Sequence, residues 1–364
     1  MRATAIAIIG SIFVGQGYSQ RMISSLYFIG DAGKTTIANN GVPELLRRNF
    51  IKATPSSFVF LGDNIYPEGM PPVGNPGRAK AENIIHAQLE MVKEFRSPVY
   101  FIPGNHDWKK GSRRGLDYVR GEQRYVDSLR NPLVNYLPKE GCPGPSEVQL
   151  SGDVVLIIID SQWFLQQAYD STGNRNSCSC KRLEDVLIAV QELMKKNAGK
   201  RIILAAHHPI YSYGEHGGVF SWRAHVFPLT DINPRLYLPL PIVGSLYPLY
   251  RKWIGDPQDL ANPLNQRYRV AIEQLLKKYP KTLFVSGHEH ALEYVVKDGV
   301  SYMVSGSAVN SSYVKRKKYA SYASSKNGFA RIDVFEDTSL SISYFEVGKN
   351  DVAFRVHLPP LSEY

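Results

Sequence analysis

The stretch Phe58-Val-Phe-Leu-Gly-Asp-Asn-Ile-Tyr66 joins a short apolar run to a polar turn. Four successive apolar residues predict a strand that is buried on both faces, and Gly62 permits the tight turn that ends it. The carboxyl and phenol groups of Asp63 and Tyr66 follow at the strand end. The same order, a buried strand and then a polar cluster, recurs along the chain and indicates its fold class.

Six apolar runs of this kind alternate with segments of helical pattern. The predicted strands are 26–29, 58–61, 99–102, 154–159, 202–206 and 283–285, and the predicted helices are 43–52, 79–95, 116–129, 183–196 and 268–278. Buried strands that alternate with helices indicate an α/β layered sheet. After residue 301 the helical pattern ends, and 328–334, 339–347 and 353–358 alternate apolar and polar residues, which predicts antiparallel strands.

The composition is that of a globular protein with a basic surface. The chain has 364 residues, of which 43% are hydrophobic and 21% charged, and this excludes a disordered chain or a coiled coil. Its net charge of +10 favours anionic partners such as small phosphorylated substrates. The basic run at 315–318 has no interleaved aromatic residues, so we interpret it as a solvated loop and expect no nucleic-acid partner.

The first residues are typical of a secretory signal peptide. Arg2 precedes an apolar stretch at 3–14, and Gly17 and Ser19 suit the cleavage site, so we expect residues 1–19 to be removed. A buried first helix or strand is the alternative. The longest later aliphatic run, 154–159, is too short to cross a membrane. We therefore expect a secreted or periplasmic protein without a transmembrane segment.

The rest of the chain, 20–364, is predicted to be a single catalytic domain with a proline-rich insertion at about 228–263. This insertion holds seven prolines in 36 residues, which predicts irregular backbone. It forms either a wall over the functional site or a packing excursion remote from it. Of the three cysteines, Cys142 pairs with Cys178 or with Cys180 if the compartment is oxidising.

Polar clusters follow five of the predicted strands. They are Gly30-Asp-Ala-Gly33, Gly62-Asp-Asn-Ile-Tyr66, Gly104-Asn-His-Asp107, Ala206-His-His208 and Gly287-His-Glu-His290. The carboxyl ends of strands in an open α/β sheet meet at one edge, where such folds place their sites. Carboxylate oxygens and imidazole nitrogens are suitable ligands for two adjacent metal ions. The sequence therefore predicts a binuclear metal site.

One competing motif is excluded. Gly30-Asp-Ala-Gly-Lys-Thr35 ends like a phosphate-binding P-loop. That motif requires a glycine five residues before Gly33, and Phe28 occupies the position. We therefore expect no nucleotide cofactor.

The ordered set of motifs resembles the calcineurin-like metallophosphoesterases, and among them the purple acid phosphatases of the small, tartrate-resistant type. Typical calcineurin-like enzymes carry histidine where Gly33 stands and lack the tyrosine that is Tyr66 here. The resemblance covers about residues 25–310. It implies a four-layer α/β/β/α sandwich with mixed sheets.

The resemblance also implies a set of metal ligands. The first metal would be held by Asp31, Asp63, Tyr66 and His290, and the second by Asp63, Asn105, His207 and His288. A phenolate favours Fe(III), and the imidazole and amide set suits a divalent iron, zinc or manganese ion. His207 rather than His208 is the implied ligand, because the family spacing to Pro209 and to Glu215-His-Gly217 fits it.

The function that follows is the hydrolysis of phosphate monoesters by a metal-bound hydroxide, as in an acid phosphatase. His106 and His216 are the predicted catalytic residues, since an imidazolium can protonate the leaving oxygen. The alternatives are a phosphodiesterase or nucleotide hydrolase on the same metal core and, in a different class, a metal-bound binding protein without activity.

Overall fold

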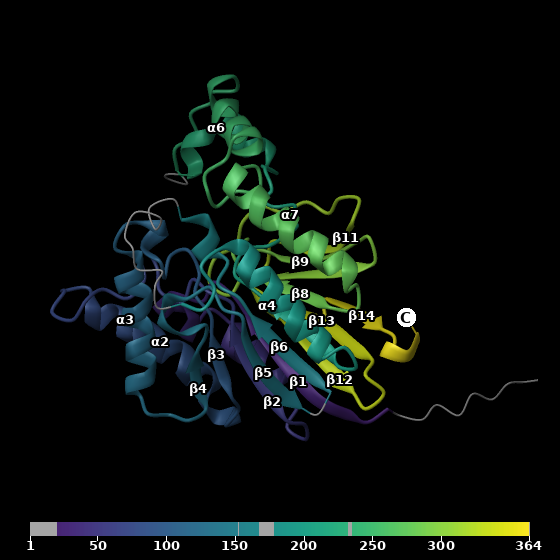
Figure 1. Cartoon of the computed structure of the whole chain (residues 1–364). Coiled ribbons are helices and arrows are strands. Elements are labelled where there is room, and N and C mark those ends of the chain that lie inside the picture. Colours follow the sequence, from purple (N-terminus) through teal and green to yellow (C-terminus); the bar gives the residue numbers. More distant parts are fainter. Residues whose placement is uncertain (1–19, 152, 167–177, 232–234, 364) are drawn as a thin grey trace, which may run out of the picture.

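The computed structural model describes residues 20–151, 153–166, 178–231 and 235–363. Its centre is a pair of mixed seven-stranded sheets with helices beside them (Figure 1). The predicted α/β sandwich is thereby confirmed. The predicted signal peptide, residues 1–19, lies outside the described residues.

The first sheet combines a parallel and an antiparallel half. Its strand order is β14 (Phe354–Leu358), β13 (Leu340–Glu346), β12 (Gly328–Phe335), β1 (Met22–Ile29), β2 (Ser56–Phe60), β3 (Val99–Phe101) and β4 (Val134–Tyr136). Strands β1 to β4 run parallel, and β12 to β14 pair antiparallel, as the alternating pattern predicted.

The second sheet is arranged in a similar way. Its order is β11 (Ala320–Ser324), β9 (Leu292–Lys297), β10 (Val300–Ser305), β8 (Leu283–Ser286), β7 (Arg201–Ala205), β6 (Val154–Ile158) and β5 (Ser146–Ser151). Strands β6, β7, β8 and β10 are parallel, with antiparallel β5 at one edge and β9 and β11 at the other.

The central strands of both sheets are buried on both faces because each sheet lies between helices and the other sheet. Consecutive strand side chains point to opposite faces. In β1, Leu26 and Phe28 belong to the core between the sheets, whereas Tyr27 and Ile29 pack against helices. The helices on this side are α1 (Val42–Asn49), α2 (Arg78–Val92) and α3 (Gly115–Ser128).

On the other side, α4 (Leu183–Lys196) and α7 (Pro263–Lys278) cover the second sheet. Helix α7 begins five residues before the predicted start at 268, because the Asn262 side chain accepts a hydrogen bond from the Leu264 amide and Pro263 occupies the first turn. None of the helices in the described residues has the length and apolar character needed to span a membrane.

The proline-rich insertion is more regular than predicted. It contains helix α6 (Val243–Trp253), although Pro248 lacks the amide hydrogen that would bond the Gly244 carbonyl. The helix packs against α5 (Trp222–Val226), and a Cβ atom on Gly244 would lie 2.4 Å from the His225 carbonyl oxygen. This close packing stabilises a helix that its local sequence disfavours, so the prediction of irregular backbone is wrong for this part.

A disulfide joins Cys142 to Cys178, and Cys180 is a buried free thiol. The bridge selects one of the two pairings that the sequence left open. It links the segment after β4 to the segment before α4 and closes a loop with a sequence separation of 36 residues.

Breaking this bridge should destabilise the fold. For a loop of this length, we expect Cys142→Ser to lower the free energy of unfolding by about 3–4 kcal/mol, since the unfolded chain regains its freedom. Urea unfolding with and without reductant measures this. Reductant should lower the stability of the wild-type protein and of Cys180→Ala but leave Cys142→Ser unchanged. Equal responses of all three proteins would contradict the prediction.

Candidate metal centre

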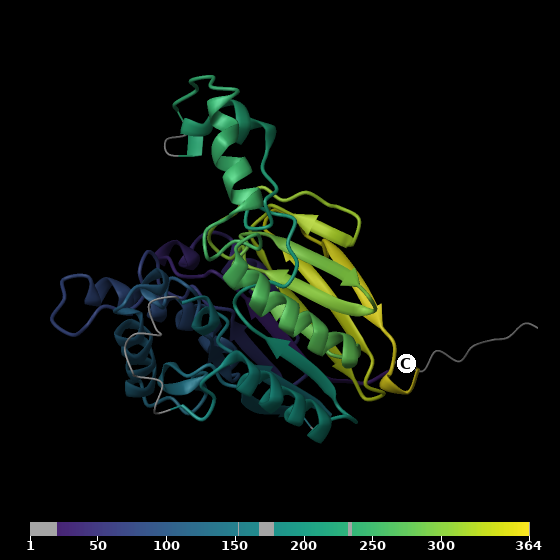
Figure 2. The same ribbon diagram turned by 45° about the horizontal axis from the view of Figure 1, so that its top comes forward.

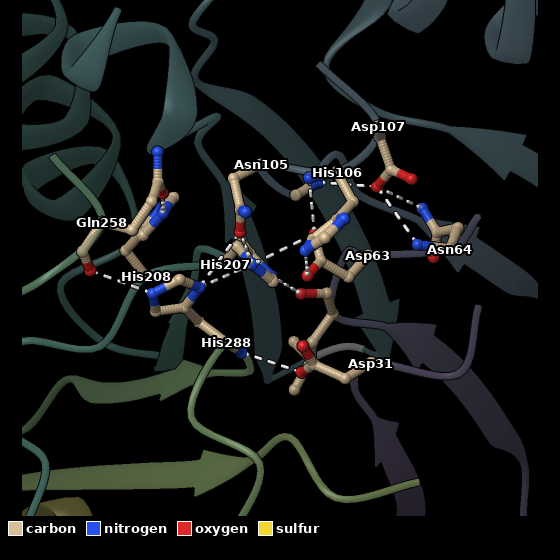
Figure 3. A network of polar contacts seen from close by, with 12 residues as sticks. Asp31, Asp63, Asn64, Asn105, His106, Asp107, His207, His208, Gln258 and His288 are labelled. Atoms are coloured by element: carbon tan, nitrogen blue, oxygen red, sulfur yellow. Dashed lines mark hydrogen bonds and ion pairs between the residues drawn. The ribbon is translucent and has the colours of Figure 1, made fainter. Parts of the chain in front are cut away.

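The predicted site residues converge where the carboxyl ends of the two sheets meet. Asp31 follows β1, Asp63 follows β2 and Asn105 follows β3, all in the first sheet. His207 follows β7 and His288 follows β8 in the second sheet. Figure 3 shows these five side chains pointing toward one another.

The backbone is strained at several of these positions. Asp31, Asp63 and His288 have φ angles of 59°, 52° and 68°, in the left-handed region that costs a side-chain-bearing residue about 1–3 kcal/mol. Gly104 allows the close approach of two loops, since a Cβ atom there would lie 2.4 Å from Asp63 Oδ1. Such strain clusters at functional sites, where the surrounding structure holds it in place.

The first predicted ligand set is assembled. The Tyr66 hydroxyl donates to Asp31 Oδ1 at 3.0 Å and lies 3.0 Å from His290 Nε2. His290 Nε2 is 3.5 Å from Asp31 Oδ1. The potential metal-ligand atoms of Asp31, Tyr66 and His290, from three different loops, therefore lie within 3.5 Å of one another.

The second set is equally close. Asn105 Oδ1 lies 3.0 Å from His207 Nε2 and 3.1 Å from His288 Nδ1, and these two nitrogens are 3.2 Å apart. Asp63 Oδ1 is 3.4 Å from His207 Nε2. The structure thus brings all seven predicted ligands together, and their binding of metal remains a prediction.

The electrostatics of the site suit cations. Burial raises the pKa of Asp63, but the charges of His106 and His207 and the His106 amide outweigh it and lower that pKa to about 2. Asp63 is therefore an anion. Burial beside Asp31 and Asp63 holds the pKa of the Tyr66 phenol well above its usual range, so the phenol ionises only if a nearby cation compensates.

The donor set fits two metal ions. The two buried carboxylates have imidazole rings as neighbours. Asp31 lies beside His290, and Asp63 lies beside His106 and His207. An imidazole ring is charged only when it is protonated. Carboxylate, phenol and amide oxygens with imidazole nitrogens are ligands that iron, zinc and manganese accept. The residues present therefore match the metal centre that the sequence implied.

His208 is close to the site, but both nitrogens of its ring have hydrogen-bond partners outside the predicted ligand set. With His207 and His288 it forms a second group whose ligand atoms lie within 4.8 Å of one another. However, its Nδ1 lies 2.8 Å from Ser161 Oγ and its Nε2 lies 2.6 Å from Gln258 Oε1. Both nitrogens are thus occupied by protein partners, which favours Asn105 as the ligand beside His207.

The two predicted catalytic histidines lie at the rim of the cluster. His106 Nδ1 lies 2.6 Å from the Pro67 carbonyl oxygen, and its Nε2 is 3.8 Å from Asp63 Oδ2. His216 Nδ1 lies 2.9 Å from Asp259 Oδ1, and its ring centre is 4.0 Å from that of His288. Both side chains are partly exposed, as contact with a substrate requires.

Sequence reasoning missed three residues that hold His216 and His288. The buried Asp259 carboxylate accepts hydrogen bonds from His216 and from Arg251, and the Gln258 carbonyl oxygen lies 3.0 Å from His288 Nε2. All three belong to the proline-rich insertion. A carboxylate and an arginine eight residues apart are too common to signal a site, so only the folded chain reveals this contact.

Comparisons with known proteins agree with this geometry. The family model described as calcineurin-like phosphoesterase matches residues 25–292. Purple acid phosphatase 3 of Arabidopsis thaliana is 25% identical over 222 residues, which cover 57% of this chain and 54% of that protein. The match therefore spans about half the length of that relative.

Solved structures share the fold. One is GAP50, the anchor in the inner membrane complex of Plasmodium, with a TM-score of 0.55, 16% identity and coverage of 93% of this chain and 90% of that one. Another is the purple acid phosphatase PPD1 from yellow lupin seeds, with a TM-score of 0.51, 14% identity and coverage of 93% and 54%. At these identities the likeness concerns the fold alone.

The two adjacent histidines offer a matched test of the metal ligands. We expect His207→Gln to lower the metal content per chain, because it removes a nitrogen that faces Asn105 and His288. His208→Gln should leave the metal content unchanged. Elemental analysis of gel-filtered protein measures both, with circular dichroism as the folding control. If His208→Gln loses as much metal, the group formed with His208 is the binding site instead.

Proposed function

The chain belongs to the calcineurin-like phosphoesterase family, and we propose that it hydrolyses phosphate monoesters with a binuclear metal centre, as purple acid phosphatases do. The observation that carries the proposal is the position of Asp63. Ligand atoms of Asp31, Asp63 and His207 lie within 4.8 Å of one another, so the two predicted ligand sets adjoin at Asp63. This proximity supports the proposal that Asp63 would serve both metal ions.

We further propose Fe(III) in the set that contains Tyr66 and a divalent ion in the set that contains Asn105. The phenol is the hard donor that Fe(III) prefers, and the imidazoles and amide suit a divalent ion. Such a pair of ions, held by these residues, would supply charge neutralisation for a phosphate dianion and activation of a water molecule near neutral pH.

His106 is suited to protonate the leaving oxygen. Nδ1 of His106 donates a hydrogen bond to the Pro67 carbonyl oxygen, and Nε2 faces the site near Asp63. When Nε2 also carries a proton, it can donate that proton to the leaving oxygen of a bound phosphate ester. The ring stands edge-on to Tyr66, with centres 4.5 Å apart, which limits its rotation.

His216 is oriented by Asp259. Its Nδ1 donates to the buried carboxylate, so Nε2 is the nitrogen left for a substrate oxygen. Arg251 also bonds Asp259. Burial raises the pKa of the Asp259 carboxyl, but the hydrogen bonds from His216 and Arg251 outweigh it and lower that pKa.

The disulfide supports the proposal that the protein is exported. Disulfides persist in oxidising compartments, and the Cys142–Cys178 bridge is therefore compatible with the secretory signal proposed at residues 1–19.

The proposed function is tested by metal removal. We expect the purified protein to contain iron and one divalent ion, to absorb visible light and to hydrolyse p-nitrophenyl phosphate. A chelator should abolish the activity, and iron with zinc or manganese should restore it. Tyr66→Phe should remove the visible band, since a phenolate on Fe(III) causes it.

A second substrate separates the alternatives. Faster hydrolysis of bis(p-nitrophenyl) phosphate than of the monoester would make the protein a phosphodiesterase. Hydrolysis of neither ester by the metal-loaded protein would leave a binding function and contradict the proposal.

The role of His106 is tested with esters of different leaving groups. We expect His106→Ala to lower kcat by about 10²-fold or more for an alkyl phosphate and by much less for p-nitrophenyl phosphate, whose leaving group needs no proton. Steady-state kinetics at equal metal content measure this. His86→Ala, an exposed histidine of α2, is the matched control and should affect neither ester. Equal losses on both esters in His106→Ala would exclude the acid role.

A further inference from the structure

The proline-rich insertion carries an unusual concentration of exposed apolar side chains. We call residues 221–231 and 235–254 the outcrop, because they project from the body of the protein in both views (Figures 1 and 2). Of the eighteen large apolar residues that are exposed in the described part of the chain, eleven belong to the outcrop. Ile242, Trp222 and Trp253 are 83%, 72% and 69% exposed.

Helix α6 presents its apolar face to the outside. The exposed members of this stripe are Val243, Leu246, Tyr247, Tyr250, Trp253 and the following Ile254. At 100° per residue they cover an arc of about 120° along the whole helix. The side that faces the protein holds Gly244, Pro248 and Arg251 instead. This orientation is the reverse of that in an ordinary surface helix, whose apolar side faces the core.

The helix is fixed in this orientation at its C-terminal end. Arg251 bonds the buried Asp259 carboxylate and donates to the Tyr247 hydroxyl at 3.0 Å. A Cβ atom on Gly218 would lie 2.8 Å from Lys252 Cα, so the chain before the outcrop packs directly on α6. Contacts of Arg251 and Lys252 with the body of the protein therefore keep the apolar stripe on the outer side of α6.

The charges of the outcrop are almost all positive. It contains four basic residues, Arg223, Arg235, Arg251 and Lys252, and one acidic residue, Asp231. The exposed basic run at 315–318 lies beside the chain that leads into the outcrop, because the Lys315 amide donates to the Tyr213 carbonyl oxygen at 3.1 Å. Partial burial and the charges of Lys252 and Lys315 lower the pKa of Lys317.

We propose that the outcrop docks on the surface of a membrane that contains anionic phospholipids. The stripe of α6 would enter the boundary between headgroups and acyl chains, where tryptophan and tyrosine rings are favoured. The basic residues Arg223, Arg235 and Lys252 would meet the lipid phosphates. The hydrolytic site stays on the body of the protein, joined to α6 through Arg251 and Asp259.

The positive charge of the outcrop favours an anionic membrane over a second copy of the chain as its partner. Arg251 faces the protein and pairs with Asp259, so two outcrops that face each other would bring six basic side chains together against two acidic ones, and such like-charge contact opposes association. An anionic bilayer satisfies both the apolar stripe and the positive charge.

Vesicle sedimentation of the full protein tests the proposal. We expect binding to phosphatidylcholine vesicles that contain phosphatidylglycerol, weaker binding to pure phosphatidylcholine, and loss of binding at high salt. Leu246→Asn should lower the partition coefficient by about tenfold, because it removes a large apolar group from the stripe. Lys252→Gln should weaken binding to the anionic vesicles only.

The matched control is Ile188→Asn on α4, since Ile188 is 58% exposed and Leu246 is 63% exposed. It should bind vesicles like the wild-type protein. Both variants should keep the thermal unfolding midpoint and the hydrolysis of p-nitrophenyl phosphate in solution.

Three outcomes would overturn the proposal. They are the absence of wild-type binding to both vesicles, equal binding by the two asparagine variants, and a dimer in light scattering that Leu246→Asn dissociates. The last result would show that a second copy covers the stripe. Because none of these outcomes depends on catalysis, the proposal can fail while the proposed hydrolase stands.

Discussion

Among the hydrogen bonds that join the two sheets where the site is built, the one made by His207 orients a predicted metal ligand. His207 Nδ1, after β7 of the second sheet, lies 2.7 Å from the carbonyl oxygen of Leu61, after β2 of the first. A carbonyl oxygen only accepts, so Nδ1 carries a proton, and in the neutral imidazole Nε2 would have its lone pair toward Asn105 and Asp63. The same contact therefore aligns the sheet ends and selects the histidine nitrogen that can hold a metal ion.

Close packing of the loops around this bond explains their glycines and their strain. A Cβ atom on Gly62 would lie 2.6 Å from His207 Nδ1, in the place of the histidine ring. The Asp107 carboxylate accepts from the amides of Gly104 and Asn64, at 2.8 and 3.2 Å, and so ties the loop after β3 to the loop after β2. These contacts hold Asp63 at a positive φ angle that it would not adopt alone.

The proline-rich insertion contributes to two different surfaces. Near its C-terminal end, Gln258 and Asp259 contact histidines of the site. This part of the insertion therefore lies against the site, as one of the two alternatives from the sequence predicted. Its aromatic residues, including Tyr237 and Trp253, instead remain exposed on the outcrop. Arg251 connects the two parts, because it pairs with Asp259 and also lies 3.2 Å from His216 Nδ1.

Local patterns in the sequence were sufficient for the alternation of strands and helices and for the polar clusters at the strand ends, whereas the four-layer sandwich and the set of ligands were implied by the family resemblance. Apolar runs such as 154–159 and helical segments such as 183–196 are recognisable because periodicity reports burial within one element. The polar clusters were recognisable because they stand at strand ends, and strand ends of a parallel sheet share an edge.

The tertiary structure decided what depends on contacts between distant segments. It separated His207 from its neighbour His208 by their partners, joined Cys142 to Cys178 rather than Cys180, and placed Asp259 behind His216. It also kept α6 helical despite Pro248, through packing at Gly244. Such pairings arise from the geometry of the closed chain, which no local pattern encodes.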